Sequence, residues 1–457
     1  MLSYQPAREL AHLVRTGQLS AREVMAAHLD RIARFNPILN AIVSKLDDER
    51  CLALADEADR VLRRGADVGP LHGLPFAFKD LEPAVGFPAT SGSPIFRGFQ
   101  PGEDSALVTR LRSAGVVAIG KTNVPEFGMG SHTYNRVFGT TRNPYDLTRT
   151  AGGSSGGAGA ALAAGLLPLA DGSDLGGSLR NPANFNNIVA LRPTVGMVPA
   201  DPPPAPLPEL SVKGPMARSV DDLALLFEVM SGRTIGALER DMTGTRVAWS
   251  VDLGVLPVDR DVRTVLEASR HVLEDIGCVV CDDRPDLSAA DDVFLTIRRR
   301  RTWLTFGDLL VRHRDEMKPE AIEEIEMGGS ISDNALAAAI AEHDRLKQQV
   351  AAFFERYDYL ACAVNQVPPF DADLDWPHSI DGMAMDHYVS WMKSAYWISA
   401  TTSPSVSVPA GFTHDGLPVG LQLVAAPGRD VELLRLAHAF EQATGFGRIR
   451  PPLAGDR

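Results

Sequence analysis

The sequence predicts an α/β fold in which a large, mainly parallel β-sheet is covered by helices on both faces. Two observations support the prediction. From about residue 70 onward, short apolar runs typical of strands alternate with amphipathic runs typical of helices. In addition, 40 glycines and 32 prolines separate these runs without forming low-complexity segments. Such alternation is typical of proteins whose successive strands run in the same direction.

The first 65 residues predict a helical segment. Within it, "LSAREVMAAHLDRIARF" begins with a capping box between Ser20 and Glu23, and apolar residues follow at helical spacing. A strand "LPFAFKD", a helix "DSALVTRLRSAG", a strand "VVAI" and a helix of small residues after residue 155 come next. We therefore expect the sheet to follow a helical N-terminal segment.

The second half of the chain continues this pattern less regularly. A helix predicted over 261–277 leads into "CVVC" (278–281), which has the pattern of a strand. Residues 285–395 are the least regular and the most aromatic, so we expect an irregular region there. The chain closes with two strands around an Asp415-Gly416 turn.

We expect residues 1–457 to form a single domain. The clearest break in the pattern is "ADPPPAPLPELS" (200–211), which could be a linker between domains. However, this segment is short and the alternation resumes on both sides of it. The segment therefore predicts a rigid surface loop or lid.

Charge and composition restrict the class of protein. A net charge of -13 argues against an extended nucleic-acid footprint, and the one basic run, "RRRR" at 298–301, predicts a helix surface or a partner contact. The N-terminus lacks the apolar core of a signal peptide. The longest run of small and apolar residues, 156–170, is too short to span a bilayer. We therefore expect a cytoplasmic protein without membrane contact. Four cysteines are too few for a disulfide framework, and "CVVC" has no second pair to complete a metal site.

One motif predicts a function that its context excludes. "GVVAIGKT" (115–122) fits the pattern GxxxxGK[ST] of phosphate-binding loops. In a true phosphate loop, a strand precedes the first glycine and the variable residues form the loop. Here a helix precedes Gly115, the variable residues are apolar or β-branched, and a proline follows soon after. We therefore expect a strand at this position.

Three stretches together indicate chemistry: "GLPFAFKD" with Lys79, "AGGSSGGAG" with Ser154 and Ser155, and "GSDLGGSLR" with Ser178. Serine becomes nucleophilic when a base accepts its proton, and a lysine whose pKa is lowered by burial is such a base. A second hydroxyl between the two can relay the proton, because a hydroxyl both donates and accepts. Glycines before the nucleophile leave backbone N–H groups open to a developing oxyanion. The pattern therefore predicts a serine hydrolase without a catalytic histidine.

Together these stretches resemble the amidase signature family, whose members hydrolyse amides with a Ser-cisSer-Lys triad. The resemblance extends through "GKTNVPEF", "GPMARSVDDLALL" and "VSVPAGFTHDGLPVGLQLV", and so covers most of the chain. It implies that Lys79 is the base, Ser154 the bridging serine and Ser178 the nucleophile. It also implies a large mixed, mostly parallel sheet with helices on both sides, and a cis peptide bond between Gly153 and Ser154.

The resemblance implies roles for further residues. The expected donors to the oxyanion are the backbone N–H groups of Leu175, Gly176, Gly177 and Ser178. Ser155 is expected to support the hydrogen-bond network, and Asp174 and Arg180 to hold the nucleophile loop. The chain departs from the family's pattern at Leu175, where a threonine is usual, and this departure does not touch the triad.

The resemblance also implies a substrate pocket lined by "FGMGSHTYN" (127–135) and by the irregular region 285–395. Within it, Met129, Gly130 and Tyr134 are the candidate substrate-binding residues, and their apolar character favours a small amide, aryl amide or carbamate (urethane). No metal and no organic cofactor are implied. We expect a monomer or homodimer that binds no nucleic acid.

Two alternatives remain open. The A subunit of the tRNA-dependent glutamyl/aspartyl amidotransferase shares the triad and works in a complex with partner subunits. A binding protein that has lost catalysis is the other alternative, and the presence of Lys79, Ser154 and Ser178 argues against it. Copurification with a partner subunit would distinguish the first alternative from a free amidase.

Overall fold

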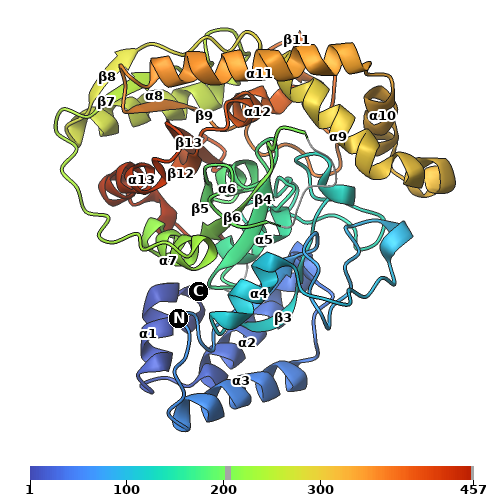
Figure 1. The fold of residues 1–457 in the computed structure, drawn as a ribbon. Coiled ribbons are helices and arrows are strands. Elements are labelled where there is room, and N and C mark those ends of the chain that lie inside the picture. Colours follow the sequence, from blue (N-terminus) through green and yellow to red (C-terminus); the bar gives the residue numbers. More distant parts are fainter. Residues whose placement is uncertain (201–206, 454–457) are drawn as a thin grey trace.

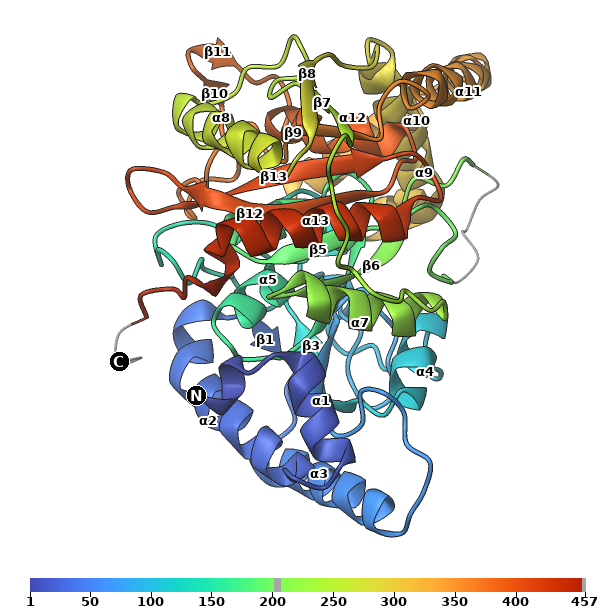
Figure 2. The same ribbon diagram turned by 90° about the vertical axis from the view of Figure 1, so that its left-hand side faces the viewer.

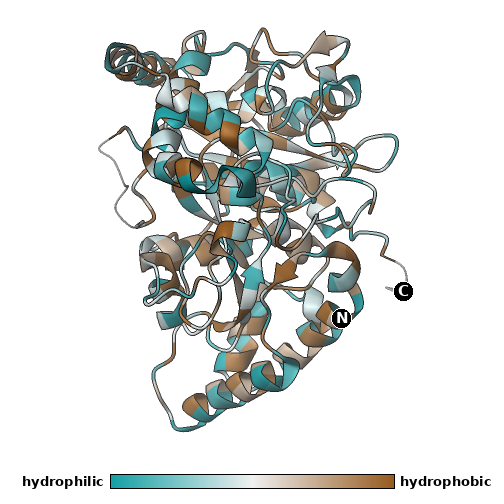
Figure 3. Cartoon of the chain, turned by 90° about the vertical axis from the view of Figure 1, so that its right-hand side faces the viewer, coloured by the Kyte–Doolittle hydropathy of each residue, from teal (hydrophilic) through white to brown (hydrophobic). Residues whose placement is uncertain are grey.

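The computed structural model describes residues 1–200 and 207–453. The N-terminal segment is helical, as predicted, and forms the base of the molecule (Figure 1). Its helices are α1 (Ala7–Arg15), α2 (Ala21–Leu39) and α3 (Asp48–Arg63). The capping box between Ser20 and Glu23 is present at the start of α2. In Figure 3, the helices of this part carry hydrophobic and hydrophilic residues along the same helix, as amphipathic helices do.

A small three-stranded sheet lies next to these helices, and one of its strands ends at Lys79. Its strands, in spatial order, are β1 (Ile42–Val43), β3 (Val117–Thr122) and β2 (Pro75–Lys79). Strand β2 runs parallel to β3, and Lys79 pairs with Thr122. Helix α4 (Ala106–Ser113) precedes β3, so "GVVAIGKT" is a helix end followed by a strand, as expected, and is not a phosphate loop.

The large sheet has eight strands among the described residues. In spatial order they are β4 (Ala170–Asp174), β6 (Val212–Ala217), β5 (Val189–Arg192), β12 (Ser405–Phe412), β13 (Pro418–Ala425), β9 (Tyr359–Ala363), β7 (Arg246–Trp249) and β8 (Val279–Asp282). The prediction of a large mixed sheet is confirmed. The prediction that it is mostly parallel is wrong, because five of its seven strand pairings in the described residues are antiparallel.

The order of β4, β5 and β6 explains this difference. Strands β4 and β5 are connected through a helix and run in the same direction, as the alternating pattern predicts. Strand β6 then returns and inserts between them, antiparallel to both. A local pattern of strands and helices specifies the direction of successive strands, but it does not specify which strands become neighbours. The predicted hairpin around Asp415-Gly416 adds the antiparallel pair β12 and β13.

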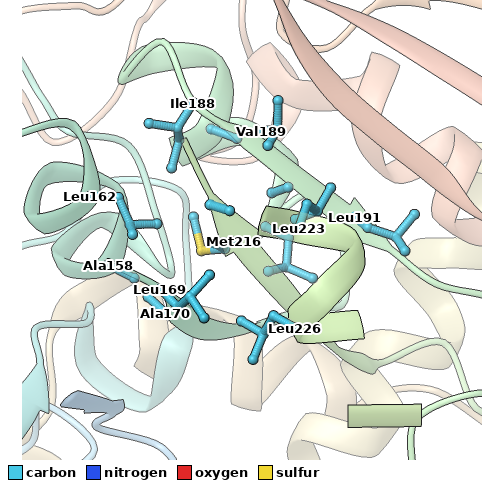
Figure 4. Close-up of a cluster of buried hydrophobic side chains, with 14 of the residues drawn as sticks. Ala158, Leu162, Leu169, Ala170, Ile188, Val189, Leu191, Met216, Leu223 and Leu226 are labelled. Atoms are coloured by element: carbon cyan, nitrogen blue, oxygen red, sulfur yellow. The ribbon is translucent and has the colours of Figure 1, made fainter. Parts of the chain in front are cut away.

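Helices cover both faces of the large sheet, as predicted. Figure 2 shows one face covered by α7 (Val220–Ser231), α8 (Arg260–Asp275) and α13 (Asp430–Thr444). The other face carries α5 (Gly156–Ala163), α6 (Arg180–Phe185) and α12 (Lys393–Ala400). Between α5, α7 and the strands lies a tightly packed group of buried aliphatic side chains, which includes Leu162, Met216 and Leu223 (Figure 4).

Residues 285–395 contain three long helices, so the prediction of an irregular region is wrong for most of this segment. The helices are α9 (Ala290–His313), α10 (Pro319–Gly329) and α11 (Asp333–Phe353). A short hairpin of β10 (Ser379–Ile380) and β11 (Met383–Ala384) follows β9. The run "RRRR" lies within α9, as the prediction of a helix there expects, although Arg298 is buried and is not part of the surface.

The four arginines of this run are paired within the chain. Arg298 and Arg299 lie near Glu324, and Arg298 is buried. Arg300 lies 3.3 Å from Asp333, and Arg301 lies 3.0 Å from Glu209. A basic surface that neutralises phosphates would need unpaired cations, so these ion pairs argue against a nucleic-acid role for the run.

Three further predictions concern single segments. "CVVC" forms β8 and its flank, as expected, and both of its cysteines are free thiols. Of the proline-rich segment 200–211, residues 201–206 lie outside the described residues. Within the part of the chain that the structure describes, no helix has the length and apolar character needed to cross a membrane.

Candidate active site

The predicted catalytic residues come from three elements that meet between the two sheets. Lys79 is the last residue of β2, Ser154 and Ser155 precede α5, and Ser178 lies between β4 and α6. The backbone N–H of Ser155 donates to the carbonyl of Ser178 at 3.2 Å, which joins the glycine-serine stretch to the nucleophile loop. The structure therefore brings together residues that are up to 99 positions apart in the sequence.

The amine of Lys79 is surrounded by hydroxyl groups. Its Nζ lies 2.9 Å from Ser154 Oγ, 2.8 Å from Ser155 Oγ and 2.9 Å from Ser173 Oγ. The carbonyl of Ser173 is a more distant neighbour at 3.4 Å. A neutral amine donates two hydrogen bonds and accepts one, and each of these hydroxyls can donate or accept. The arrangement can therefore bind Lys79 in its neutral form.

Burial favours this neutral form. The Lys79 side chain has no exposed surface, and burial lowers the pKa of Lys79 to about 7, with a further lowering by the nearby charge of Lys213. Asp171 lies beside Lys79 and accepts its backbone N–H at 3.1 Å. Burial also raises the pKa of Asp171 to about 7, so this carboxyl does not hold a full counter-charge near neutral pH.

The peptide bond between Gly153 and Ser154 is cis, as expected. Ser131 Oγ donates to the Gly153 carbonyl of this bond at 2.7 Å. Asn181 Nδ2, one turn after Ser178, donates in turn to Ser131 Oγ at 2.7 Å. This chain of hydrogen bonds links α6 to Ser154 through the loop that contains Met129.

The nucleophile loop is folded around Asp174. Asp174 Oδ1 accepts the backbone N–H of Gly177 at 2.8 Å, and Oδ2 accepts that of Leu179 at 3.2 Å. This corrects the predicted set of oxyanion donors, because the N–H of Gly177 is directed at Asp174. The backbone N–H groups of Leu175, Gly176 and Ser178 have no acceptor among the described residues. Three N–H groups thus remain for a substrate oxygen.

Two arginines hold Asp174 in place. Arg180 donates to both carboxylate oxygens of Asp174 at 3.0 and 2.9 Å, and Arg192 lies 3.3 Å from Oδ1. All three side chains are fully buried. The two guanidinium groups and the loop N–H groups outweigh the cost of burial and hold the pKa of Asp174 well below its usual range. Asp174 and Arg180 therefore anchor the loop, as the sequence predicts.

The predicted substrate-binding residues lie on the loop that passes the bridging serine. A Cβ at Gly128 would lie 3.6 Å from Ser154 Oγ, so the loop runs directly beside this hydroxyl. The carbonyl of Met129 accepts a hydrogen bond from Lys318 Nζ at 2.7 Å. Tyr134 donates its hydroxyl to Glu320 at 2.8 Å. At Gly130, a Cβ would contact the ring of Tyr388 at 3.5 Å, which leaves little room for a side chain there.

An aromatic and aliphatic cluster continues from this loop. Phe127 stacks on Phe306 of α9 with ring centroids 4.6 Å apart, and Phe96 lies against Phe127 with centroids 6.1 Å apart. Met129 and side chains of α9 and α10 complete the cluster. This apolar cluster thus adjoins the polar groups around Ser154, a combination that is typical of small-molecule sites.

Sequence patterns missed two residues of this site. Ser173 contacts the amine of Lys79, and Asp171 contacts its backbone. Both lie in β4 two residues apart, so their side chains lie on the same face of the strand. The "DGSD" segment carried this alternation, but nothing in the sequence indicated that this face is turned toward β2.

The described residues contain no group of three or more His, Cys, Asp or Glu side chains arranged to hold a metal ion.

A family model described as amidase matches residues 23–434. The protein belongs to the amidase signature family. It is thus an amidase signature enzyme, a hydrolase that acts on amides.

Relatives of two kinds are similar over almost the whole chain. An acylamidase from Rhodococcus erythropolis is 33% identical, with 98% of each chain covered. The A subunit of the glutamyl-tRNA(Gln) amidotransferase of Carboxydothermus hydrogenoformans is 32% identical, with 99% of this chain and 100% of the relative covered. Sequence identity alone does not separate these two kinds of relative.

Solved structures confirm the fold. A bacterial aryl acylamidase of the amidase signature family has a TM-score of 0.90 at 27% identity, over 98% of this chain and 99% of the other. A 6-aminohexanoate cyclic dimer hydrolase in complex with its substrate has a TM-score of 0.85 at 27% identity, over 98% and 99% of the two chains. The arrangement of sheets and helices described above is therefore that of the family.

Proposed function

We propose that the protein is an amidohydrolase that cleaves a small linear amide through an acyl-enzyme, with Ser178 as nucleophile, Ser154 as bridge and Lys79 as base. The observation that supports this proposal most strongly is the buried amine of Lys79 within 2.9 Å of Ser154 Oγ. A buried lysine with a pKa lowered to about 7 has a substantial neutral fraction at physiological pH.

The proton transfers follow the order of the three residues. Ser178 gives its proton to Ser154 as Ser154 gives its own to neutral Lys79, and Ser178 Oγ forms a bond to the substrate carbonyl carbon. The proton then returns through Ser154 to the leaving nitrogen, the C–N bond breaks and the amine departs. Water then gives a proton to the same relay and its oxygen bonds to the acyl carbon. The bond between this carbon and Ser178 Oγ breaks, Ser178 Oγ regains a proton from the relay and the acid leaves.

The oxyanion of each tetrahedral intermediate lies, in this proposal, against the N–H groups of Leu175, Gly176 and Ser178. Because Asp174 already holds Gly177 and Leu179, the loop is set before substrate arrives. Donors that are fixed in advance stabilise the developing charge without a cost of reorganisation. Loss of one such donor in a hydrolase typically costs about 3 kcal/mol in the transition state.

The proposed substrate has an apolar or aryl group next to its amide or carbamate. The loop of Met129, Gly130 and Tyr134 passes beside the bridging serine, and Phe127 and Phe306 extend its apolar side. An aromatic lining of this kind binds apolar groups by burial and ring contacts. The resemblance to acylamidases and to an aryl acylamidase agrees with this substrate class.

A hydrolysis assay tests the proposal. An acyl p-nitroanilide and a p-nitrophenyl carbamate are offered to the wild type and to the Ser178→Ala and Lys79→Ala variants, with folding checked by circular dichroism. We expect the wild type to release p-nitroaniline or p-nitrophenol and both variants to lose turnover. Full activity in the folded Ser178→Ala variant would contradict the proposal. The faster substrate distinguishes an amidase from a carbamate hydrolase.

A second candidate function is the A subunit of a tRNA-dependent amidotransferase, which the similarity to such subunits favours. In that case the chain would act with partner subunits. Copurification from the native host with such a partner, together with amide hydrolysis that depends on it, would support this candidate. Turnover by the purified chain alone would support the free amidase.

A further inference from the structure

A second lysine lies next to the base. Lys213 of β6 pairs with Ser173 of β4 in the antiparallel register, and these strands are neighbours in the sheet (Figure 1). Residues directly opposite each other in an antiparallel pair direct their side chains to the same face. Ser173 Oγ contacts Lys79 Nζ at 2.9 Å. The side chain of Lys213 therefore starts on the face of the sheet that holds the amine of Lys79.

Glu82 holds the ammonium of Lys213. The two form an ion pair in which the Glu82 side chain is 2% exposed and the Lys213 side chain is 22% exposed. Ser105 Oγ also donates to Glu82, at 3.0 Å. Glu82 follows Lys79 by three residues, and its backbone N–H donates to the Lys79 carbonyl at 2.9 Å. The position of Lys213 is thus tied to the same turn that positions Lys79.

The charges around Lys79 come from every element packed against it. Acidic groups on β4 and after β2 attract a proton to its amine, and cations on β3 and β6 oppose them. These groups are Asp171 and Asp174 on β4, Asp80 and Glu82 after β2, Lys121 on β3 and Lys213 on β6. After burial, the charge of Lys213 is the largest influence that lowers the pKa of Lys79. The acidic neighbours act in the opposite direction.

Two ammonium groups in one site do not hold their protons equally. Lys213 reaches solvent and is paired with Glu82, and both features stabilise its ammonium form. Lys79 is fully buried among hydroxyl groups, so it loses its proton first.

We propose that Lys213 is a positioning residue that acts through Lys79: its fixed positive charge keeps the amine of Lys79 unprotonated, ready to accept a proton from Ser154. This inference rests on the proposed function, in which Lys79 is the base. Lys213 itself does not exchange a proton with substrate or with the serines.

The pH dependence of kcat/KM on an acyl p-nitroanilide tests this role. Only neutral Lys79 accepts a proton, so activity falls as the pH drops below the pKa of Lys79. In Lys213→Gln we expect the midpoint of this acid limb to move upward by about half a pH unit or more. We expect the alkaline plateau to stay within about threefold of wild type, because Lys79 is neutral there in both proteins. A merely structural role would lower the plateau and leave the midpoint in place.

Two control variants keep the comparison specific. Lys213→Arg retains the charge and is expected to retain the midpoint. Lys347→Gln removes an exposed lysine of α11 and is expected to change neither the midpoint nor the plateau. An upward shift in Lys213→Arg equal to that in Lys213→Gln would overturn the electrostatic role.

A double variant decides the question if Lys213→Gln does not fold. Lys213→Gln leaves Glu82 buried without its cation, whereas Glu82→Gln with Lys213→Gln removes both charges. Lys213 influences the pKa of Lys79 more strongly than Glu82 does, so the double variant is expected to shift the midpoint upward by a smaller amount. A midpoint unchanged from wild type in the folded double variant would overturn the inference.

A measurement without turnover separates this inference from the proposed function. In Ser178→Ala protein with 13Cε-labelled lysine, the signal absent from a Lys79→Ala sample belongs to Lys79. Its NMR titration is expected to move to higher pH when Lys213→Gln is added. If it does not move, the role of Lys213 is wrong even where the hydrolysis assay succeeds. If the Lys79 titration moves but Lys79→Ala retains activity, the proposed function is wrong, because Lys213 then sets the protonation of a lysine that the reaction does not use.

Discussion

The amine of Lys79 is the group on which the proposed reaction depends. Its pKa is lowered to about 7, mainly by burial, so the group is protonated at acid pH and neutral at alkaline pH. We expect kcat/KM for an acyl p-nitroanilide to fall with a midpoint near pH 7 as the pH decreases, and to reach a plateau above it. A pH–rate profile with purified enzyme measures this directly. An acid limb with a midpoint far below the pKa of Lys79 would contradict a lysine base.

Removal of either end of the relay is expected to have a large effect. Ser178→Ala removes the nucleophile, and Lys79→Ala removes the acceptor of its proton. We expect each to reduce kcat by on the order of 10⁴-fold or more. When catalytic residues act as one unit, replacing one of them removes most of the rate enhancement that the whole unit provides. The double variant is expected to lose little beyond either single variant. Additive losses in single-turnover measurements would show that the residues act independently.

Asp174 is expected to be important for stability as well as for activity. Asp174→Asn would leave the buried guanidinium groups of Arg180 and Arg192 without their shared anion. Breaking a buried ion pair in this way costs about 3 to 5 kcal/mol. Chemical denaturation at neutral pH measures the loss. A matched variant, Asp373→Asn, removes an exposed carboxylate paired with Arg142 and is expected to change stability by less than about 1 kcal/mol.

Sequence patterns could single out the proposed triad because its three members lie in separate short motifs. Lys79 ends an apolar strand, and Ser154 and Ser178 each follow two glycines. Each residue therefore belongs to a short motif that can be recognised from local sequence. Ser173 and Lys213 lie in ordinary strand segments. Their contact with the base depends on the pairing of β4 with β6 and on the packing of β2 against β4. Neither contact is specified by local sequence.

At the scale of elements, α5 must approach the loop after β3 closely. A Cβ at Gly157 would lie 2.3 Å from the backbone nitrogen of Asn123 and 2.6 Å from the carbonyl oxygen of Ala41. Both atoms belong to the backbone and cannot move aside cheaply. We therefore expect Gly157→Ala to destabilise the protein by about 1 to 3 kcal/mol, the usual cost of overpacking a close contact.

The control for this variant is Gly98→Ala. A Cβ added at Gly98 would have no atom within 4 Å, and the backbone conformation there is ordinary. Thermal denaturation of both variants measures the difference. An equal melting temperature for Gly157→Ala and wild type would show that α5 is free to shift away from Asn123. Because Ser154 and Ser155 precede α5, such a shift would also alter the distance to Lys79.

Predictions for elements succeeded where the pattern was local. The capping box of α2, the strand after Gly115 and the hairpin around Asp415-Gly416 all form as expected. The prediction of a mostly parallel sheet failed because β6 inserts between β4 and β5, antiparallel to both. The long helices of 285–395 were expected only at the run "RRRR", because buried charges such as Arg298 replace apolar residues on the inner face of α9.

At the scale of the whole molecule, the site is assembled within one chain. Lys79 Nζ contacts Ser154 Oγ, and the backbone N–H of Ser155 donates to the carbonyl of Ser178, all within this chain. We therefore expect the purified chain, without other subunits, to hydrolyse the p-nitroanilide. Size-exclusion chromatography with an activity assay across the fractions tests this. Activity that appears only with a copurifying partner would favour the amidotransferase alternative.

Covalent labelling of the nucleophile tests the central claim most directly. The protein is incubated with a p-nitrophenyl carbamate over a range of pH on both sides of neutrality, and the modified residue is located by peptide mass spectrometry. We predict that the acyl group is attached to Ser178 and that the rate of labelling falls below about pH 7 with the protonation of Lys79. Attachment to Ser154 or Ser155, or a rate that does not depend on pH, would contradict the account.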